Sequence, residues 1–327
     1  MHKNICGIQQ VGIGVKDARE AWKWYRRAFG MDISVFEDTA TAKLMLPYTN
    51  GKECERYAAL AMNMEGGGGF EIWQHTRMNP SPAVFDIKLG DTGIFITKMK
   101  SRDVNASYKQ HEQMGINILG APGQNPAGQL HYYLTDPYNN IFEVVEDDYS
   151  YKKEKSPTGG VAGAVIGVSD IDEARKIYSD ILEYDIVVSD ESGQFEDLSP
   201  LPGSNEKYRR VLLQHKPRTG PFSKLLGPTQ IELIQPLEEQ GVLVRRSREM
   251  LETEIDRFVV AERDGMIIGC AALYAYPREQ AGELSCFAVN PGYRRGGRGD
   301  TILNMVESMA RAQGLARLFV LTTQTEH

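Results

Sequence analysis

The stretch QQVGIGVKDAREAWKWYRRAFGM, residues 9–31, decides the fold because the spacing of its apolar residues changes at one aspartate. Strand-forming residues precede Asp17, and four apolar residues then recur at spacings of three and four: Ala18, Trp22, Tyr25 and Phe29. This stripe predicts an amphipathic helix that packs on a sheet. Asp17 suits the N-cap because its carboxylate accepts hydrogen bonds from the first-turn amides, and Gly30 suits the left-handed stop.

Two later segments repeat this change of spacing. They are TKMKSRDVNASYKQHEQMGINI at residues 97–118 and GAVIGVSDIDEARKIYSDILEYDI at residues 163–186, with Asp103 and Asp170 at the expected helix starts. The second segment carries an apolar stripe of Val104, Tyr108 and Met114 and ends at Gly115. The third carries Ile171, Ala174, Ile177 and Ile181. A unit that recurs in this way predicts three copies of one structural repeat.

Each repeat ends in a short apolar segment that holds one glutamate. These segments are FEIWQ (70–74), FEVVE (142–146) and IELIQ (231–235), and their glutamates are Glu71, Glu143 and Glu232. Burying an unpaired carboxylate costs several kcal/mol, so each glutamate should meet a compensating group. The turn sequence DPYNN before the second segment favours a tight hairpin. Each repeat is therefore predicted to be a βαβββ unit.

These heads and tails resemble the vicinal oxygen chelate superfamily, which includes glyoxalase I, extradiol dioxygenases and fosfomycin-resistance enzymes, over about residues 5–238. The resemblance implies an α+β fold in which tandem βαβββ units form a cupped mixed sheet. We expect residues 1–150 to pair two units, about 5–78 and 88–148, in one domain. Residues 151–238 are expected to form a third unit that lacks a complete partner.

The resemblance also implies a divalent metal held by the first and last strands of paired units. Carried over residue by residue, the metal ligands are Gln10, Glu71 and Glu143, the oxygen donors that glyoxalase I also uses. The candidate metals are Mg, Mn, Ni, Fe and Zn, and oxygen donors favour Mg, Mn or Ni among them. Glu143 is the candidate catalytic base that removes a proton next to a metal-bound carbonyl.

One ligand position departs from the pattern of the superfamily. Glyoxalase I has a histidine where residues 90–99 offer none, and the register leaves Thr92, Ile94 or Ile96 at that position. Two interpretations therefore stay open. Either three ligands and water hold a catalytic ion, or the three side chains hydrogen-bond one another in a metal-free binding cup. In the third repeat Gly163 offers no donor atom, so this repeat is interpreted as structural.

Histidines add little to this set of ligands. His131 is the best placed, on a strand that faces the cup, and we interpret it as a structural residue. His75, His111 and His215 are expected to be exposed or to lie at the rim.

The pattern of the chain changes after residue 238. A predicted strand, ELSCFAVN at 283–290, leads into the glycine-rich turn RRGGRGD at 294–300 and then into a helix. Glycines let backbone amides approach a pyrophosphate, and the start of a helix attracts its negative charge. This turn resembles the signature of the GNAT acetyltransferases. Residues 231–327 resemble the acetyltransferase domain of the bacterial N-acetylglutamate synthases.

This second resemblance implies that residues 239–327 form a GNAT-like α/β domain that binds acetyl-CoA. The implied cofactor contacts are Ala288, Val289, Arg294, Arg295, Gly297, Gly299 and Asp300, and the implied catalytic base is Glu283. GNAT domains extend further at both ends, so this one is expected to be truncated and inactive in acetylation. The stretch IELIQPL at 231–237 suits both a last βαβββ strand and the end of a GNAT helix, which suggests a chimera joined there.

Composition excludes several functions. The formal net charge of -7 gives no footprint for nucleic acid, and the chain lacks the run of about 18 apolar residues that a membrane helix needs. The cysteines form no CxxC pair, which fits reduced thiols in the cytoplasm. We expect a cytoplasmic protein with a small-molecule substrate, and the open edge of the third unit suggests a homo-oligomer.

Three functions follow from these observations. The first is metal-assisted lyase, isomerase or dioxygenase chemistry on a small metabolite by the βαβββ units. The second is a metal-free module for small-molecule binding or resistance. The third is an amino-acid N-acetyltransferase whose truncation leaves at most acetyl-CoA binding.

Overall fold

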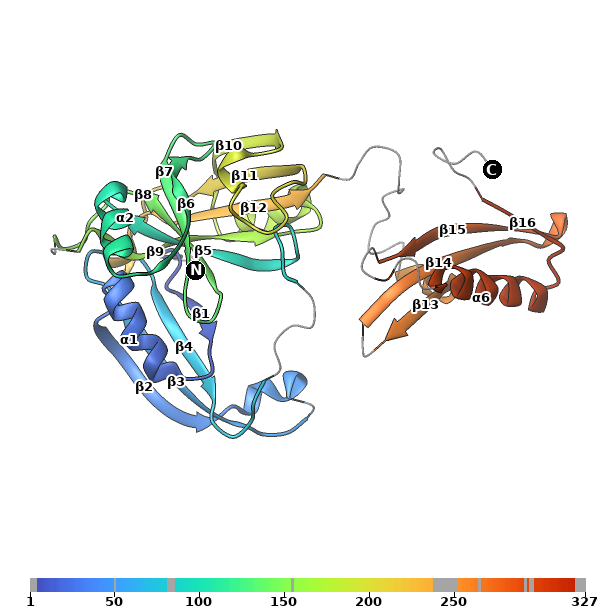
Figure 1. Ribbon diagram of the computed structural model, residues 1–327, viewed down its shortest axis with the longest axis horizontal. Coiled ribbons are helices and arrows are strands. Elements are labelled where there is room, and N and C mark those ends of the chain that lie inside the picture. Colours follow the sequence, from blue (N-terminus) through green and yellow to red (C-terminus); the bar gives the residue numbers. More distant parts are fainter. Residues whose placement is uncertain are drawn as a thin grey trace. The chain divides into compact units, whose positions relative to one another are not determined.

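The computed structural model describes residues 5–49, 51–80, 86–153, 156–237, 252–263, 266–290, 293 and 297–320. It folds into two compact units, Met1–Leu237 and Glu238–His327, which are treated separately below. Sheets dominate both units, so the chain has the α+β fold that its sequence predicts (Figure 1). Among the described helices, none is both long enough and apolar enough to cross a membrane.

The first repeat forms a four-stranded sheet with one helix. Its elements are β1 Gln10–Gly14, α1 Ala18–Phe29, β2 Ile33–Thr41, the short 3-10 helix Lys43–Tyr48, β3 Glu55–Met62 and β4 Gly69–His75. The strand order is β1-β4-β3-β2, with β1 parallel to β4 and the other pairs antiparallel. The first strand of the repeat is thus an edge strand.

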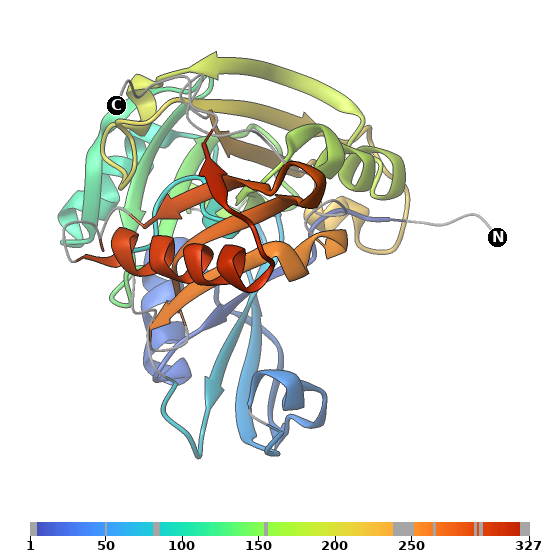
Figure 2. The same ribbon diagram turned by 90° about the vertical axis from the view of Figure 1, so that its right-hand side faces the viewer.

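The second and third repeats share one eight-stranded sheet. The second repeat consists of β5 Gly93–Ser101, α2 Val104–Gln113, β6 Asn117–Gln124, β7 Leu130–Thr135 and β8 Ile141–Glu146. The third consists of β9 Thr158–Gly167, α3 Ile171–Arg175, a π-helix Lys176–Ile181, β10 Ile186–Gly193, a 3-10 helix Glu196–Leu198, β11 Tyr208–Gln214, α4 Ser223–Leu226 and β12 Gln230–Pro236. The order β10-β11-β12-β9-β5-β8-β7-β6 joins the two repeats through antiparallel β5 and β9, and Figure 2 shows these teal-to-yellow strands curving. We call the concave interior of this sheet the paired cup.

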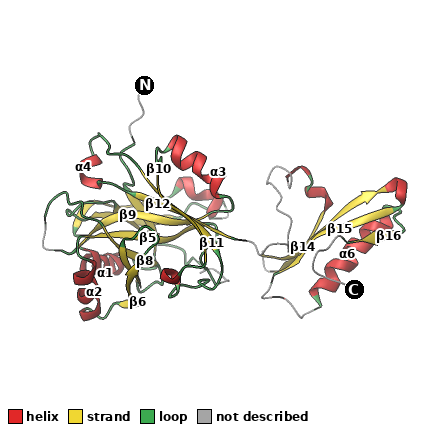
Figure 3. Ribbon diagram, turned by 90° about the horizontal axis from the view of Figure 1, so that it is seen from above, coloured by secondary structure: helices red, strands yellow, loops and turns green. Residues whose placement is uncertain are grey.

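This pairing differs from the one expected, in which residues 1–150 paired the first two repeats and the third lacked a complete partner. The first two repeats instead pack back to back, with α1 beside α2 (Figures 1 and 3). The His111 ring on α2 donates to the Ala28 carbonyl oxygen on α1 (2.8 Å), and the Tyr25 hydroxyl donates to Asp136 (2.6 Å). Apolar side chains of both repeats form one shared core. Helix stripes predict that a face is covered but not which repeat covers it.

Local features follow the sequence closely, except in the third helix. Asp17, Asp103 and Asp170 cap their helices as predicted, each accepting from first-turn amides. The predicted stripe of the third helix is wrong at Ile177 and Ile181, which are 54% and 55% exposed. A π turn holds more residues than an α turn and rotates the stripe. Tyr178 and Leu182 consequently pack on the sheet in their place.

The ambiguous stretch IELIQPL is a strand. β12 pairs antiparallel with β11 and parallel with β9, and Leu233 and Ile231 are buried beneath α3. This segment therefore completes the third repeat and is not the end of a GNAT helix in this structure.

Glycines join the first sheet to the larger one. Residues 66–69 run beside residues 159–161, with Gly68 and Val161 exchanging two backbone hydrogen bonds (2.9 and 2.8 Å). A Cβ at Gly160 would lie 2.4 Å from the Gly68 carbonyl oxygen, and one at Gly67 would lie 2.7 Å from the Gly160 carbonyl carbon. We call this contact the glycine junction. At positions 67 and 160 only glycine fits.

Among its described residues, the second compact unit holds a smaller sheet and the long helix α6. Its elements are the 3-10 helix Ile255–Arg257, β13 Phe258–Arg263, β14 Met266–Tyr276, the 3-10 helix Pro277–Glu279, β15 Ala281–Val289, α6 Arg298–Ala312 and β16 Arg317–Phe319. The order is β13-β14-β15-β16, with β16 parallel to β15. Ile302, Val306 and Ala310 of α6 pack on the sheet.

The glycine junction predicts that Gly160→Ala destabilises the fold. The added methyl group overlaps backbone atoms that cannot rotate away, and such overpacking typically costs about 1–3 kcal/mol. Urea unfolding followed by tryptophan fluorescence measures this, because all three tryptophans lie in the first repeat. Gly123→Ala in β6 is the matched control, since its Cβ would meet nothing within 4 Å. Equal stability of the two variants would contradict the role of the junction.

Candidate functional site

A buried lysine lies at the centre of the paired cup. The Lys98 ammonium is 2.8 Å from Glu143 Oε2 and 2.6 Å from Glu232 Oε2. Lys98 comes from β5, and the carboxylates come from the last strands of the second and third repeats, β8 and β12. The side chains of Lys98 and Glu143 are fully buried, and that of Glu232 is nearly so. Two glutamates of the repeated tails thus meet the compensating group that burial requires.

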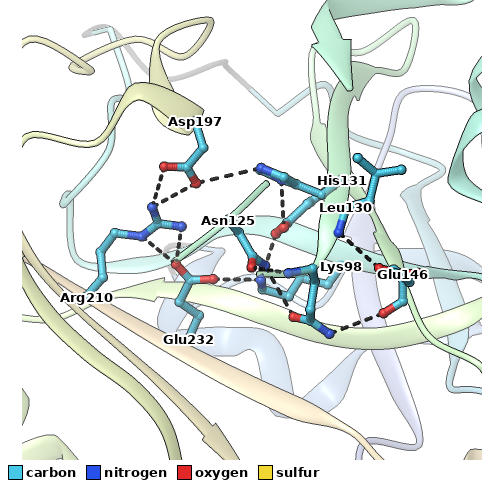
Figure 4. A network of polar contacts seen from close by, with 10 residues as sticks. Lys98, Asn125, Leu130, His131, Glu146, Asp197, Arg210 and Glu232 are labelled. Carbon is cyan, nitrogen blue, oxygen red and sulfur yellow. Dashed lines mark hydrogen bonds and ion pairs between the residues drawn. The ribbon is translucent and has the colours of Figure 1, made fainter. Parts of the chain in front are cut away.

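Further charged groups extend this cluster across the cup (Figure 4). Arg210 on β11 donates from Nε to Glu232 (2.7 Å) and from Nη1 to both oxygens of Asp197 (2.8 Å each). His131 on β7 places Nδ1 3.0 Å from Glu143 Oε1 and Nε2 3.7 Å from Asp197. We call these six residues, Lys98, His131, Glu143, Asp197, Arg210 and Glu232, the cup network.

Strand alternation and register bring the cup network together. Phe142 and Val144 point into the shared helix core, so Glu143 between them points into the cup. The register places Lys98 directly beside Glu143 on one side and beside Gly163 on the other. Residues of the first and last strands of both repeats therefore surround one point.

Mutual charge compensation keeps the network ionised. Burial by itself raises the pKa of Glu143, but Lys98 and His131 lower it below its ordinary value. Burial likewise raises the pKa of Glu232, and Arg210 and Lys98 bring it below the ordinary value. For Lys98, burial lowers the pKa, but the two glutamates raise it above its ordinary value. The ammonium and both carboxylates are therefore charged at neutral pH.

The paired cup does not fit a divalent metal. The point where the two glutamates converge holds the Lys98 ammonium, and a metal ion beside it would meet a positive charge at contact distance. Gly163 offers no donor atom on the opposite strand. Among the described residues, no group of three or more His, Cys, Asp or Glu side chains is arranged to hold an ion.

Two of the three predicted metal ligands lie together in a different place. Gln10 on β1 donates from Nε2 to Glu71 Oε2 on β4 (2.5 Å). Their strand neighbours Val11 and Ile72 point into the helix core, so Gln10 and Glu71 share the opposite face of the first sheet. Glu143 lies in the paired cup, on the far side of the helix layer, and its carboxylate contacts Lys98 and His131.

Sequence reasoning missed Lys98, Arg210 and Asp197. The available signal was the alternation in IFITKMK, which puts Lys98 on the same strand face as Ile96, beside a tail that puts Glu143 inward. His131 faces the cup, as predicted. His111 and His215 were expected at the surface or rim and are instead 0% and 6% exposed. Both find hydrogen-bond partners, which satisfies their rings inside the fold.

A cavity of about 360 Å³ opens beside the cup network. Its lining includes His131 and Tyr133 from β7 and Asp197 and Ser199 from the loop after β10. This volume suits a small polar molecule.

The second compact unit places several predicted acetyl-CoA contacts at one end of its sheet. In β15 the pairing with β14 shifts between Ser285 and Ala288, and Cys286 in this bulge has a φ of 54°. Val289 ends the strand, and Gly297 precedes α6, whose first turn contains Gly299 and Asp300. Arg294 and Arg295 lie outside the described residues. Glu283 accepts a hydrogen bond from the Tyr276 hydroxyl (3.3 Å).

The cup network predicts an acid-sensitive stability that depends on Glu143. Glu143→Gln leaves Lys98 with one carboxylate, and breaking a buried pair in this way costs about 3–5 kcal/mol at about pH 7. Because folding lowers the pKa of Glu143, its contribution is present above its ordinary pKa of 4.5 and is lost as the pH falls below that value. The difference between wild type and variant should therefore shrink at about pH 3.

Urea unfolding at both pH values measures this effect. Glu173→Gln is the control, because Glu173 pairs with Lys176 at the surface and should change stability by about 1 kcal/mol or less. A Glu143→Gln variant as stable as this control would contradict the prediction.

Comparison with known proteins finds two family matches in the chain. Residues 7–144 match the family model of the Glyoxalase/Bleomycin resistance protein/Dioxygenase superfamily, and residues 229–327 match that of the Acetyltransferase (GNAT) family. An amino-acid acetyltransferase of Pseudomonas putida is 66% identical over 97 residues, which are 30% of this chain and 22% of that protein. The chain thus spans about a fifth of the length of the curated relatives it matches.

Solved structures match the same two parts. N-acetylglutamate synthase from Neisseria gonorrhoeae, complexed with coenzyme A and N-acetyl-glutamate, is 32% identical, with 29% of this chain and 28% of that chain covered and a TM-score of 0.25. Glyoxalase I from Zea mays is 15% identical, with 72% and 69% covered and a TM-score of 0.42. As the sequence predicts, the chain carries a domain of the glyoxalase/bleomycin resistance protein/dioxygenase superfamily, followed by a domain of the GNAT acetyltransferase family.

Proposed function

We propose that the glyoxalase-superfamily part of the chain acts through Gln10 and Glu71, which form one half of a divalent-metal site. The observation that carries this proposal is their direct contact on one face of the first sheet. Both side chains offer oxygen donors, which suit Mg, Mn or Ni. A bound ion would supply Lewis-acid chemistry for isomerisation, lyase or dioxygenase reactions on a small oxygenated metabolite.

Two ligands form only half of a site, because catalytic metals generally take three or more protein ligands. The chain itself contains a template for completion: β5 and β9, the first strands of two repeats, join edge to edge and bring their last-strand glutamates together. The corresponding strand β1 pairs only with β4 among the described strands. We propose that a second copy of the chain pairs with it there and brings a second Gln10 and Glu71.

The open edge for this assembly is β1, which pairs only with β4 among the described strands. The other edge strand of this sheet, β2, exposes Ile33 (41%), Val35 (53%) and Phe36 (38%) and is a second uncovered surface, not part of the β1 contact. Apolar strands left uncovered favour association with another chain. The expected self-association through the third repeat changes accordingly, because β9 is already paired with β5 and the first repeat has the open first strand.

Metal binding by purified protein tests this function. Loss of even an outer-shell partner weakens metal affinity about 10–100-fold, so Glu71→Ala and Gln10→Ala should each weaken Mn²⁺ binding at least that much. Calorimetry gives the affinity, and sedimentation with and without Mn²⁺ gives the assembly state. Glu37→Ala is the matched control, because Glu37 lies in the same sheet and pairs with Arg19. Binding that survives both ligand changes, or binding by a monomer, would reject the proposed site.

A second function is favoured for the GNAT domain: binding of acetyl-CoA or CoA. The strand bulge at Cys286 and the glycine start of α6 supply backbone for a thioester and a pyrophosphate at neighbouring positions in the sequence. The solved relative from Neisseria gonorrhoeae holds coenzyme A. We propose cofactor binding by this domain.

Calorimetry of the full chain with CoA tests this second function. Gly299→Glu puts a negative charge in the first turn of α6 and should abolish measurable binding by repelling the pyrophosphate. Ser308→Glu puts the same charge near the other end of that helix and should bind CoA like the wild type. Absence of binding heat in the wild type, or equal heat in Gly299→Glu, would refute it.

A further inference from the structure

We infer that Lys98 is a built-in cation that takes the place of a metal ion in the paired cup, and that its removal would uncover a latent divalent-metal site. This inference concerns the cup network and does not rest on the metal site proposed for Gln10 and Glu71. The two places lie on opposite sides of the helix layer formed by α1 and α2.

The geometry around Lys98 is that of a coordinated cation. One nitrogen lies within 2.8 Å of carboxylate oxygens from two different repeats, Glu143 and Glu232, at the seam where β5 meets β9. The side chains of all three residues are 5% exposed or less. Water therefore contributes little to balancing these carboxylates, and the ammonium provides the balance. The Lys98 ammonium, from the first strand of the second repeat, thus occupies the place of the central ion. A metal-binding side chain at this position would instead be a ligand.

The charge balance of the cup network would accommodate an ion of higher charge than the ammonium. With His131 neutral, Lys98 and Arg210 carry two positive charges against the three carboxylates of Glu143, Asp197 and Glu232. A divalent ion in place of the ammonium would balance the remaining negative charge. His131, whose Nδ1 is 3.0 Å from Glu143, offers a further donor at the edge of the same space.

Position Gly163 explains why the cation is attached to β5. It is the residue opposite Lys98 on β9, and a Cβ there would lie 2.2 Å from the Gln230 carbonyl oxygen. No side chain at position 163 can therefore reach the centre without moving the backbone. Of these two facing positions, only position 98 carries a side chain, and that side chain decides whether the cup holds an ammonium or a ligand.

The test replaces Lys98 with a metal-binding residue and measures the affinity of the protein for Co²⁺. All variants carry Gln10→Ala and Glu71→Ala, so that failure of the site proposed in the first repeat cannot be mistaken for failure here. Lys98→His removes the ammonium and supplies an imidazole next to Glu143 and Glu232. We expect Co²⁺ to bind about tenfold or more tightly than in the Lys98 parent and to give the visible absorption bands of a protein-bound ion.

Lys100→His is the matched control. Lys100 lies two residues along the same strand, is 2% exposed and pairs with the single carboxylate of Asp147 (3.3 Å). This variant should lose stability in the same way but gain no Co²⁺ affinity, because two converging carboxylates are absent there.

Folding of Lys98→His is read by circular dichroism with and without Co²⁺. A variant that folds alone should bind the ion, and a variant that is unfolded alone should fold when Co²⁺ is added, since binding to the folded state stabilises it. Binding no tighter than in Lys100→His, or an unfolded variant that Co²⁺ does not rescue, would overturn the inference. So would Co²⁺ binding by the Lys98 parent with displacement of its ammonium, seen as loss of protection of Lys98 from amine labelling.

Discussion

Two buried carboxylates that face each other need a cation between them, and this requirement organises the larger sheet of the protein. Glu143 and Glu232 lie on the corresponding last strands of two repeats, and the Lys98 ammonium lies within 2.8 Å of both. The pairing of β5 with β9 places the lysine there. The ion pairs therefore depend on this strand pairing, and the strand pairing is in turn stabilised by the ion pairs. Arg210 then extends the same logic to Asp197, which anchors the loop after β10 against the cup.

Features set by near neighbours in the chain could be predicted from the sequence. Asp17, Asp103 and Asp170 cap helices because each acts on amides within three residues of itself. The stripe from Ala18 to Phe29 is buried because an α-helix repeats its face at fixed spacing. The third helix broke this rule, because a π turn at residues 176–181 changes the spacing and nothing local announces it.

Features set by distant contacts could not be predicted in the same way. Three similar repeats can pair in several combinations, and the choice of β9 as partner of β5 depends on the whole surface of each repeat. The ligand set Gln10, Glu71 and Glu143 assumed that the first two repeats formed one cup. Only its first two members lie together, because α1 and α2 face each other and turn the two cups apart. Lys98 could not be predicted as a site residue for the same reason, because its partners Glu143 and Glu232 lie on β8 and β12.

The helix layer between the two sheets also affects which mutations the protein can tolerate. Side chains such as Tyr25, Phe29 and Phe142 meet in one core that both sheets share, while the chemistry of each sheet lies on its outer side. A replacement on one outer side therefore leaves the other untouched, provided the middle keeps its volume. A replacement of Gln10 or Glu71 can thus leave the Lys98 ion pairs intact, so each side of the helix layer can change without a matching change on the other.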